Sequence, residues 1–217
     1  MDSNQWYLRS FFQGIDLQGK DVLDVGCGDG WCGRYALKRG ARSVIGLEPG
    51  AAGHDKKVIT RLGVAQSSIL PFTIQDYKPQ EKFDVIILHD SVNHLDEQAC
   101  IELKRDMVSR TKYYGIFSHI HHLLNSGGKI VIADASRSNL FADLRVKNPF
   151  APSIEWHKHQ KPELWISLLL KCGFKNPKVT WLTPRQLSKF NWLISNKVVS
   201  YFIVSHFRLV MEKRNVD

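Results

Sequence analysis

Cysteine is scarce in this chain, with four residues among 217. Cys27 and Cys32 are too far apart for the Cys-x-x-Cys spacing of zinc sites, and no second pair complements them. Long apolar runs are also missing, because no stretch reaches the roughly 18 uncharged apolar residues of a spanning helix. The first ten residues lack the basic-then-apolar pattern of a secretory signal. We therefore predict reduced thiols, no metal site and a cytoplasmic location.

Acidic residues are in short supply in the last third of the chain. Residues 1–140 hold 17 Lys and Arg against 16 Asp and Glu, whereas residues 141–217 hold 13 against 5. The net charge of +9 therefore comes almost entirely from the C-terminal part. Such asymmetry is typical of proteins that meet an anionic partner: nucleic acid, a membrane surface or a phosphorylated substrate. A solvated basic face that only keeps the protein soluble is the alternative.

The remaining composition is globular, with 43% apolar and 24% charged residues. Strand-like apolar runs alternate with segments of helical periodicity, and the strands are apolar on both faces. This alternation predicts an α/β fold with a parallel sheet covered by helices on both faces. The predicted strands are 21–25, 43–47, 72–74, 83–88, 129–133, 178–182 and about 201–211, and the predicted helices are 6–12, 31–39, 98–124 and 162–172.

The chain shows no internal repeat and no low-complexity linker, so we predict one domain over residues 1–217, with an N-terminal helix within 1–18. Between the last two predicted strands, residues 184–200 interleave apolar side chains with Arg185, Lys189 and Lys197. This pattern is typical of a basic amphipathic helix. A core or interface helix, a substrate lid and a peripheral membrane contact all fit it, and the oligomeric state is left open.

The strongest motif is Asp-Val-Leu-Asp-Val-Gly-Cys-Gly-Asp-Gly at residues 21–30. A buried strand runs into a turn whose glycines leave no Cβ in the way, so the backbone can lie against a ligand at the strand's carboxyl end. A nicotinamide enzyme would want GxGxxG, but Trp31 occupies the position of its last glycine. Asp24 and Asp29 would repel a pyrophosphate and would suit a ligand with an amino group and a positive sulfonium.

Three further elements follow the glycine turn. Glu48 ends the second strand, where an acid can accept hydrogen bonds from ribose hydroxyls. Residues 83–95 form an apolar strand followed by a polar cluster that contains His89 and His94. Residues 123–134 combine a helix end, a glycine turn and a strand.

These four elements, in this order and at these spacings, resemble the class I S-adenosylmethionine-dependent methyltransferase superfamily. The match covers about residues 21–136 and extends weakly onto 168–183. The resemblance implies a seven-stranded, mostly parallel sheet whose last strand is antiparallel, and S-adenosylmethionine as cofactor. It places the cofactor's methionine end at Asp24, Gly26 and Gly28, the ribose at Glu48, the adenine at Ile74 and Gln75 (with Asp76 as the neighbouring alternative), and the sulfonium above His89.

Methyl transfer requires that acceptor and methyl group are held in line, and a hydroxyl acceptor also needs a group that takes its proton. Histidine is the usual choice near neutral pH. His94 lies one helical turn after the fourth strand, and its alternative role is capping or packing. His157 and His159 follow the fifth strand, where the superfamily builds its substrate cover. As an HxH pair they could bind metal, but only Glu155 is near at motif spacing, so no metal is predicted.

The leading hypothesis is O-methylation of a small-molecule, glycan or lipid-linked acceptor, with the basic last third favouring an anionic one and a location peripheral to a membrane. An RNA- or protein-directed methyltransferase is the second hypothesis. The chain has no appended RNA-binding module, and His89-Asp-Ser-Val stands where many amino-group methyltransferases carry an Asn-Pro-Pro-Tyr-like signature. A non-catalytic cofactor-binding protein is the third, against which the glycine turn and Glu48 argue.

Overall fold

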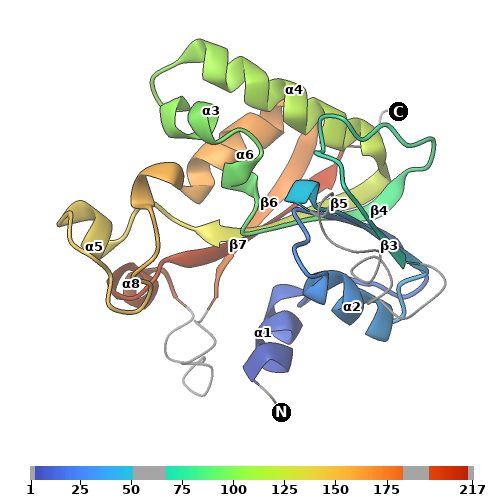
Figure 1. Ribbon diagram of the computed structural model, residues 1–217, viewed down its shortest axis with the longest axis horizontal. Coiled ribbons are helices and arrows are strands. Elements are labelled where there is room, and N and C mark those ends of the chain that lie inside the picture. The colour runs from blue at the N-terminus through green and yellow to red at the C-terminus, as the bar shows by residue number, and fades with distance from the viewer. Residues whose placement is uncertain (1–2, 51–66, 183–195, 215–217) are drawn as a thin grey trace.

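The chain folds around one seven-stranded sheet. The computed structural model describes residues 3–50, 67–182 and 196–214, and its strands lie in the order β3-β2-β1-β4-β5-β7-β6 (Figure 1). The first five strands pair in parallel, and β7 runs antiparallel to both β5 and β6. The predicted α/β sheet with an antiparallel last strand is confirmed. The strands are β1 (Asp21–Val25), β2 (Ser43–Leu47), β3 (Ser67–Leu70), β4 (Phe83–His89), β5 (Leu124–Ala135), β6 (Phe174–Trp181) and β7 (His206–Lys213).

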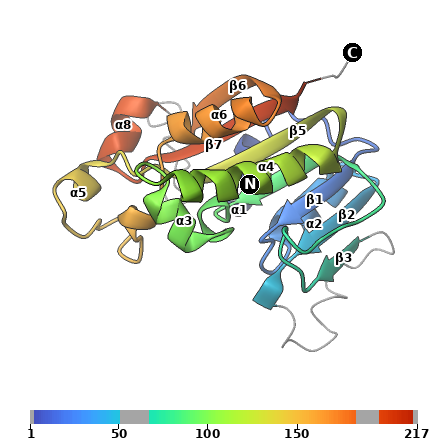
Figure 2. The same ribbon diagram turned by 90° about the horizontal axis from the view of Figure 1, so that it is seen from above.

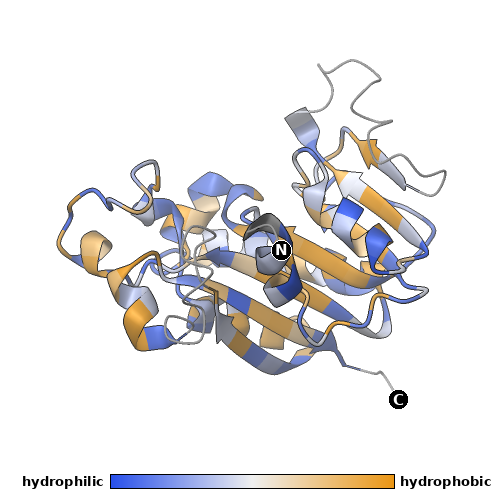
Figure 3. Cartoon of the chain, turned by 90° about the horizontal axis from the view of Figure 1, so that it is seen from below, coloured by the Kyte–Doolittle hydropathy of each residue, from blue (hydrophilic) through white to orange (hydrophobic). Residues whose placement is uncertain are grey.

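Helices cover both faces of this sheet. Successive residues of a strand face opposite sides, so Leu23 joins one buried cluster and Val22 the other. Helices α3, α4 and α6 pack on the first face, and α1 and α2 pack on the second (Figures 1 and 2). The strands are therefore largely hydrophobic along their length (Figure 3). The helices are α1 (Ser3–Phe11), α2 (Trp31–Lys38), α3 (Glu97–Glu102), α4 (Met107–Leu123), α5 (Leu140–Asp143), α6 (Pro162–Lys171) and α8 (Lys197–Phe202), with short 3-10 turns η2 (Val92–His94) and η3 (Trp156–Lys158).

The predicted third strand at 72–74 is wrong. β3 ends at Leu70 because Pro71 has no backbone N–H with which to extend the ladder. The N–H of Phe72 instead donates to the Leu70 carbonyl at 2.9 Å, which turns the chain away from the sheet.

The predicted long helix at 98–124 is two helices, α3 and α4. Asp96 begins α3 by accepting from the N–H of Ala99. Asp106 begins α4 by accepting from the N–H groups of Val108 and Ser109 at 3.2 and 2.7 Å. Each aspartate satisfies backbone donors that a helix start leaves open, so each fixes a new helix.

The C-terminal elements also differ from their predicted bounds. β7 begins at His206 rather than 201, because Asn196 caps the short helix α8, which takes up residues 197–202. β6 begins at Phe174, before the predicted 178, and its pairing with β7 is irregular between Lys175 and Lys178, where Pro177 lacks a ladder donor. Of the predicted amphipathic helix at 184–200, residues 184–195 lie outside the described residues.

The strand order reverses beside β1. The chain passes from β1 outward to β2 and β3 and then returns to form β4 on the other side of β1. In open α/β sheets such a reversal leaves a crevice at the carboxyl ends of the strands. The segments that follow β1, β2 and β4 meet there.

Candidate functional site

The turn after β1 depends on glycine. Gly26, Gly28 and Gly30 all have positive φ angles, of 69°, 53° and 77°, a region that other residues rarely adopt. A Cβ on Gly26 would lie 2.6 Å from the Cβ of Ser91, which follows β4, whereas a Cβ on Gly28 would meet nothing within 4 Å. The turn is therefore packed against β4 at its start and opens onto free space two residues later.

Glu48 connects this turn to the end of β2. Its carboxylate accepts from the N–H of Gly28 at 2.9 Å and from that of Gly50 at 3.2 Å. The N–H groups of Gly26 and Cys27 donate to the Leu47 carbonyl at 2.8 and 3.0 Å. Three of these hydrogen bonds join the two strand ends, and carboxylate oxygens can accept further bonds from a ligand.

A cavity of about 360 Å³ opens between these strand ends. Its volume lies within the usual range for small-ligand sites. Four residues predicted to bind the cofactor line it, namely Gly26, Glu48, Ile74 and Gln75, whereas Gly28 does not. His94, predicted on the acceptor side, lines it as well. The other residues that line it are Val25, Leu47, Pro49, Phe72, Thr73, Asp90, Ser91 and Leu95.

Asp24 lies below the glycine turn and does not line the cavity. It is buried, and its Oδ2 has no hydrogen-bond partner among the described residues. Burial raises the pKa of Asp24 to about 7, a backbone hydrogen bond from Gly33 opposes the rise, and the charges of Asp29 and Glu48 add to it. A buried acid with an unsatisfied oxygen is costly, and a cationic ligand above the turn would relieve that cost.

Asp90 stands at the carboxyl end of β4 and borders the cavity. Its φ of 52° is unusual for a residue with a side chain. Its carboxylate lies 2.9 Å from His206 Nε2 and 3.4 Å from His89 Nδ1. Burial alone would raise the pKa of Asp90, but the charge and hydrogen bond of His206 and the charges of His89 and His159 outweigh it and keep this pKa low. Asp90 is therefore held as a carboxylate.

His89 is buried behind Asp90 rather than on the cavity wall. The hydroxyl of Tyr7, on α1, lies 2.8 Å from His89 Nε2 and 3.4 Å from His206 Nδ1. The rings of Phe11 and Trp31 pack edge-on against His89. The N-terminal helix thus contacts both histidines through Tyr7, and one of them, His89, contacts the carboxylate of Asp90.

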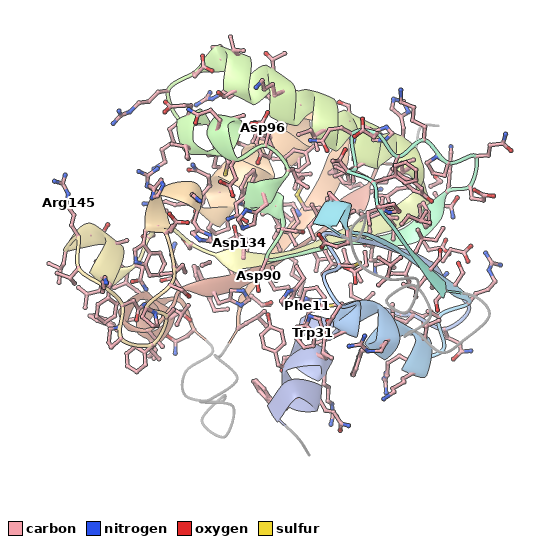
Figure 4. The ribbon with its side chains drawn as sticks, in the orientation of Figure 1. Phe11, Trp31, Asp90, Asp96, Asp134 and Arg145 are labelled. Atoms are coloured by element: carbon pink, nitrogen blue, oxygen red, sulfur yellow. The ribbon has the colours of Figure 1, made fainter. Side chains whose placement is uncertain are left out.

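A second carboxylate–histidine pair lies beside the first. Asp134, near the end of β5, is buried, and its Oδ1 lies 2.9 Å from His159 Nδ1. Burial raises the pKa of Asp134, the hydrogen bond and charge of His159 oppose the rise, and the charge of Asp90 adds to it. Figure 4 shows Asp90 and Asp134 near each other at the centre of the molecule, in agreement with the pairing of β4 and β5 through His89 and Ala133.

The three histidines predicted on the acceptor side have different surroundings. His94 borders the 360 Å³ cavity and is half exposed, with its Nδ1 2.8 Å from Glu97. His159 belongs to the buried pair with Asp134. His157 is exposed and lines a separate cavity of about 490 Å³ beside α5. Among the described residues, no group of three His, Cys, Asp or Glu side chains is placed to hold a metal ion.

Sequence reasoning did not single out Asp90, Ser91 or His206. Asp90 and Ser91 follow His89 directly, so their place after a buried strand was a usable signal. His206 is distant in sequence and reaches Asp90 only because β7 inserts antiparallel beside β5. A strand order of this kind is not readable from one sequence.

Comparison with known proteins agrees with this geometry. The family model described as "Methyltransferase domain" matches residues 6–215. A ubiquinone biosynthesis O-methyltransferase of Acinetobacter baylyi is 25% identical over 194 residues, which cover 86% of this chain and 76% of that protein. A ribosomal protein L11 methyltransferase of Aliivibrio fischeri is 39% identical over 79 residues, but the match covers only 36% of this chain and 25% of that protein.

A solved structure of similar fold carries the demethylated form of the cofactor. It is a didemethyltoxoflavin N-methyltransferase of Burkholderia thailandensis, crystallised with its substrate and S-adenosylhomocysteine. Its TM-score is 0.62 at 16% identity, with 98% of this chain and 79% of that chain covered. At this identity the likeness shows the fold.

The buried charge of Asp24 predicts a pH-dependent gain in stability for Asp24→Asn in the cofactor-free protein. Because the folded pKa of about 7 lies above the unfolded value, the protonated acid stabilises the fold at low pH and this stability is lost as pH rises through 7. The stability gained from Asp24→Asn, measured as the change in the free energy of unfolding, should therefore be larger at pH 8 than at pH 5 by on the order of 2 kcal/mol. Urea titrations at both pH values measure this. Asp29→Asn, exposed on the same turn, is the control, and an equal effect of Asp24→Asn at both pH values contradicts the buried charge.

Proposed function

Because this chain belongs to the methyltransferase domain family and is an S-adenosylmethionine-dependent methyltransferase, we propose that it methylates a hydroxyl oxygen of a small-molecule, glycan or lipid-linked acceptor. The observation that carries the proposal is the pair of carboxylate–histidine contacts at the ends of β4 and β5, one of which reaches the cavity through Asp90. A hydroxyl must lose its proton as its oxygen takes the methyl group, and such pairs can accept one. The relative from A. baylyi is named for O-methylation and matches most of this chain, which also supports an oxygen acceptor.

A macromolecular acceptor is the weaker alternative. The protein-directed relative from A. fischeri matches little more than a third of this chain. A second such relative, from Klebsiella pneumoniae, matches 67% of this chain but only 46% of its own length, whereas the relative from A. baylyi matches 86% of this chain and 76% of its own length. A small acceptor therefore has the broader support.

The residues around the cavity fit the cofactor. The space beside Gly28 leaves room for a ligand against the backbone, and Glu48 retains acceptor capacity for the ribose hydroxyls. Ile74 and Gln75, in the segment that follows β3, also line the cavity, and we assign the adenine to them. Asp24, buried below the turn with an unsatisfied oxygen, would attract the positively charged amino group from behind the backbone, and His89 supports the sulfonium end indirectly, through Asp90. When bound, the cofactor supplies an electrophilic methyl group.

The histidines form the acceptor side. We assign His94 to a substrate contact, because it shares the cavity with the cofactor residues. His159 pairs with Asp134 at the end of β5, the strand that lies beside β4 and so beside Asp90, and we therefore place it near the reacting oxygen. His157 faces the second cavity and would contact the distal part of the acceptor.

The second cavity favours an anionic group on the acceptor. It is lined by Arg137, Arg145 and Lys147, and none of the three forms an ion pair in the described part of the chain. Its two acids are already engaged, since Asp143 accepts from the Tyr201 hydroxyl at 2.8 Å and Glu155 pairs with Lys158 at 2.8 Å. A carboxylate or phosphate on the acceptor would meet uncompensated positive charge there.

The corner formed by α5 and α8 supports a peripheral membrane contact and so a lipid-linked acceptor. Large apolar side chains that are at least half exposed gather on these two helices and the segment after α5, and basic residues lie among them. An apolar patch with basic neighbours is the pattern of interfacial membrane binding. No helix in the described ranges is both long and apolar enough to cross a bilayer. The apolar side chains of this patch are Leu144, Val146, Phe150, Val198 and Phe202, and its basic residues are Arg145, Lys147 and Lys197.

The proposed reaction is tested by transfer of tritium from methyl-labelled cofactor to a panel of acceptors. The panel pairs phenols, catechols and sugars with their carboxylated forms, protocatechuate being one, and includes matched amines. We expect label on hydroxyl acceptors, with a preference of about tenfold for the carboxylated member of each pair, and loss of that preference in Arg137→Gln. Label on amines alone, or on a protein or RNA fraction alone, contradicts the proposal.

The position of the cofactor is tested by two glycine variants with equal backbone strain. Gly28→Ala and Gly19→Ala each place a Cβ at positive φ with nothing within 4 Å, so each should lose about 1 kcal/mol of stability. Gly28→Ala should weaken S-adenosylhomocysteine binding in calorimetry by tenfold or more, on the order of 1.4 kcal/mol, because its methyl group fills the space assigned to the ligand. Gly19→Ala should bind normally. Equal affinities for the two variants exclude the assigned position.

The membrane contact is tested by sedimentation with vesicles. Vesicles of phosphatidylcholine with phosphatidylglycerol should retain the protein at low salt and release it at high salt. The double variant Val198→Ser/Phe202→Ser should weaken retention by about tenfold or more. The matched control is Met107→Ser/Val108→Ser, which removes exposed apolar side chains from α4, outside the patch. If the two double variants are retained equally, whether weakly or strongly, the patch on α5 and α8 is not the surface that binds the membrane.

A further inference from the structure

We propose that His159 is the base that accepts the acceptor's proton, and that Asp134 is a positioning residue that holds His159 in the tautomer this task requires. The inference rests on the proposed O-methylation and selects one group among the histidines around the site. It follows from the geometry of the pair, from how the segment carrying His159 is held, and from what the competing histidines contact.

The geometry of the pair leaves one ring nitrogen for the reaction. Asp134 Oδ1 lies 2.9 Å from His159 Nδ1, and a carboxylate can only accept, so the Nδ1 proton of His159 donates to it. In a neutral ring Nε2 then carries the lone pair. Asp134 is almost fully buried, at 1% side-chain exposure, whereas His159 retains 13%. A buried acid behind a partly exposed imidazole is the arrangement that orients a general base and stabilises the imidazolium it becomes.

The segment that carries His159 is held on both sides. Lys158, just before it, pairs with Glu97 at 3.1 Å and with Glu155 at 2.8 Å. Gln160, just after it, is buried, and its side-chain amide donates to the Cys100 carbonyl at 2.6 Å. His159 is thereby fixed to helix α3. Such support keeps a catalytic group within the narrow range of geometry that proton transfer needs.

The surroundings of the other histidines suit them less well. His94 also has its Nδ1 on a carboxylate, but both partners are about half exposed, so solvent screens the pair. His206 has its Nε2 on Asp90, and its Nδ1 points toward the hydroxyl of Tyr7, which is buried. His157 faces the second cavity. Among the histidines of the described residues, only His159 has one ring nitrogen held by a buried acid and the other without a hydrogen-bond partner.

The proton and electron balance of the step is simple. A lone pair of the acceptor oxygen forms the new O–C bond, and the S–C bond breaks with its electrons left on sulfur, which becomes a neutral thioether. The acceptor's O–H bond breaks and its proton forms an N–H bond at His159 Nε2. The imidazolium is stabilised by Asp134 and by the nearby carboxylate of Asp90, and it returns the proton to water after product leaves.

The tautomer of His159 tests the role of Asp134 without any acceptor. Nitrogen-15 NMR of the protein saturated with S-adenosylhomocysteine, with His159→Gln for assignment, should show neutral His159 protonated at Nδ1. In Asp134→Asn the proton should move in large part to Nε2. A neutral His159 protonated at Nε2 in the unaltered protein, or a tautomer that Asp134→Asn leaves unchanged, overturns the proposal.

The kinetic arm uses tritiated cofactor and protocatechuate, or the best hydroxyl acceptor of the panel. His159→Gln and Asp134→Asn should each lower kcat by about 100-fold or more, with KM and S-adenosylhomocysteine affinity within about threefold of the unaltered enzyme. His122→Gln, an exposed histidine on α4, should leave kcat unchanged. A loss confined to KM, or an unchanged kcat in His159→Gln, overturns the assignment.

Two results separate this inference from the proposed function. If the unaltered protein binds S-adenosylhomocysteine and methylates hydroxyls while His159→Gln retains full kcat, only the assignment of the base fails. If label reaches amines alone, the proposed O-methylation fails whatever the tautomer of His159. Melting temperatures of both variants, within about 5 °C of the unaltered protein, show that any loss of kcat is not a loss of fold.

Discussion

The contact between the Glu48 carboxylate and the N–H of Gly28 is the constraint on which the site depends. It joins the turn after β1 to the end of β2, and the Leu47 carbonyl adds two more bonds to the same turn. The turn can make these bonds only because three of its residues are glycines at positive φ. With the turn held in this way, Gly26 lines the 360 Å³ cavity without a side chain, and a ligand can approach its backbone closely. The same carboxylate that shapes the turn also lines the cavity.

Around this turn the fold retains charges that a stable core would exclude. Asp24 and Asp134 are buried, and each has an oxygen without a partner among the described residues. Burial raises the pKa of both acids, which is the sign of an ionised form that is poorly solvated. Asp90 differs, because the histidines around it keep its pKa low. Acids in such different environments at the ends of three neighbouring strands can serve different tasks: contact with a cationic ligand, orientation of a base and stabilisation of its charged form.

The turn after β1 and the acid at the end of β2 could be read from the sequence, whereas the contacts that join β4 to β7 could not, for physical reasons. Gly26, Gly28 and Glu48 are local signals, since a turn after a buried strand constrains residues within a few positions of it. His206 and Asp90 meet only through the antiparallel insertion of β7, and no local pattern encodes that. The strand predicted at 72–74 is wrong because Phe72 fits the apolar pattern of a strand, whereas Pro71 has no N–H with which to continue the ladder. The single long helix predicted at 98–124 is wrong because the helical periodicity of the sequence continues across Asp106, although the side chain of Asp106 caps a new helix there.

On our proposal, the turn between Val25 and Trp31, clasped by Glu48, holds S-adenosylmethionine. A crystal structure of the protein with S-adenosylhomocysteine tests it most directly. We expect both ribose hydroxyls within about 3 Å of the Glu48 carboxylate, with the homocysteine chain along the backbone at Gly28. A nucleoside that lies elsewhere, such as in the basic cavity beside α5, with Glu48 bound only to the turn, would contradict it.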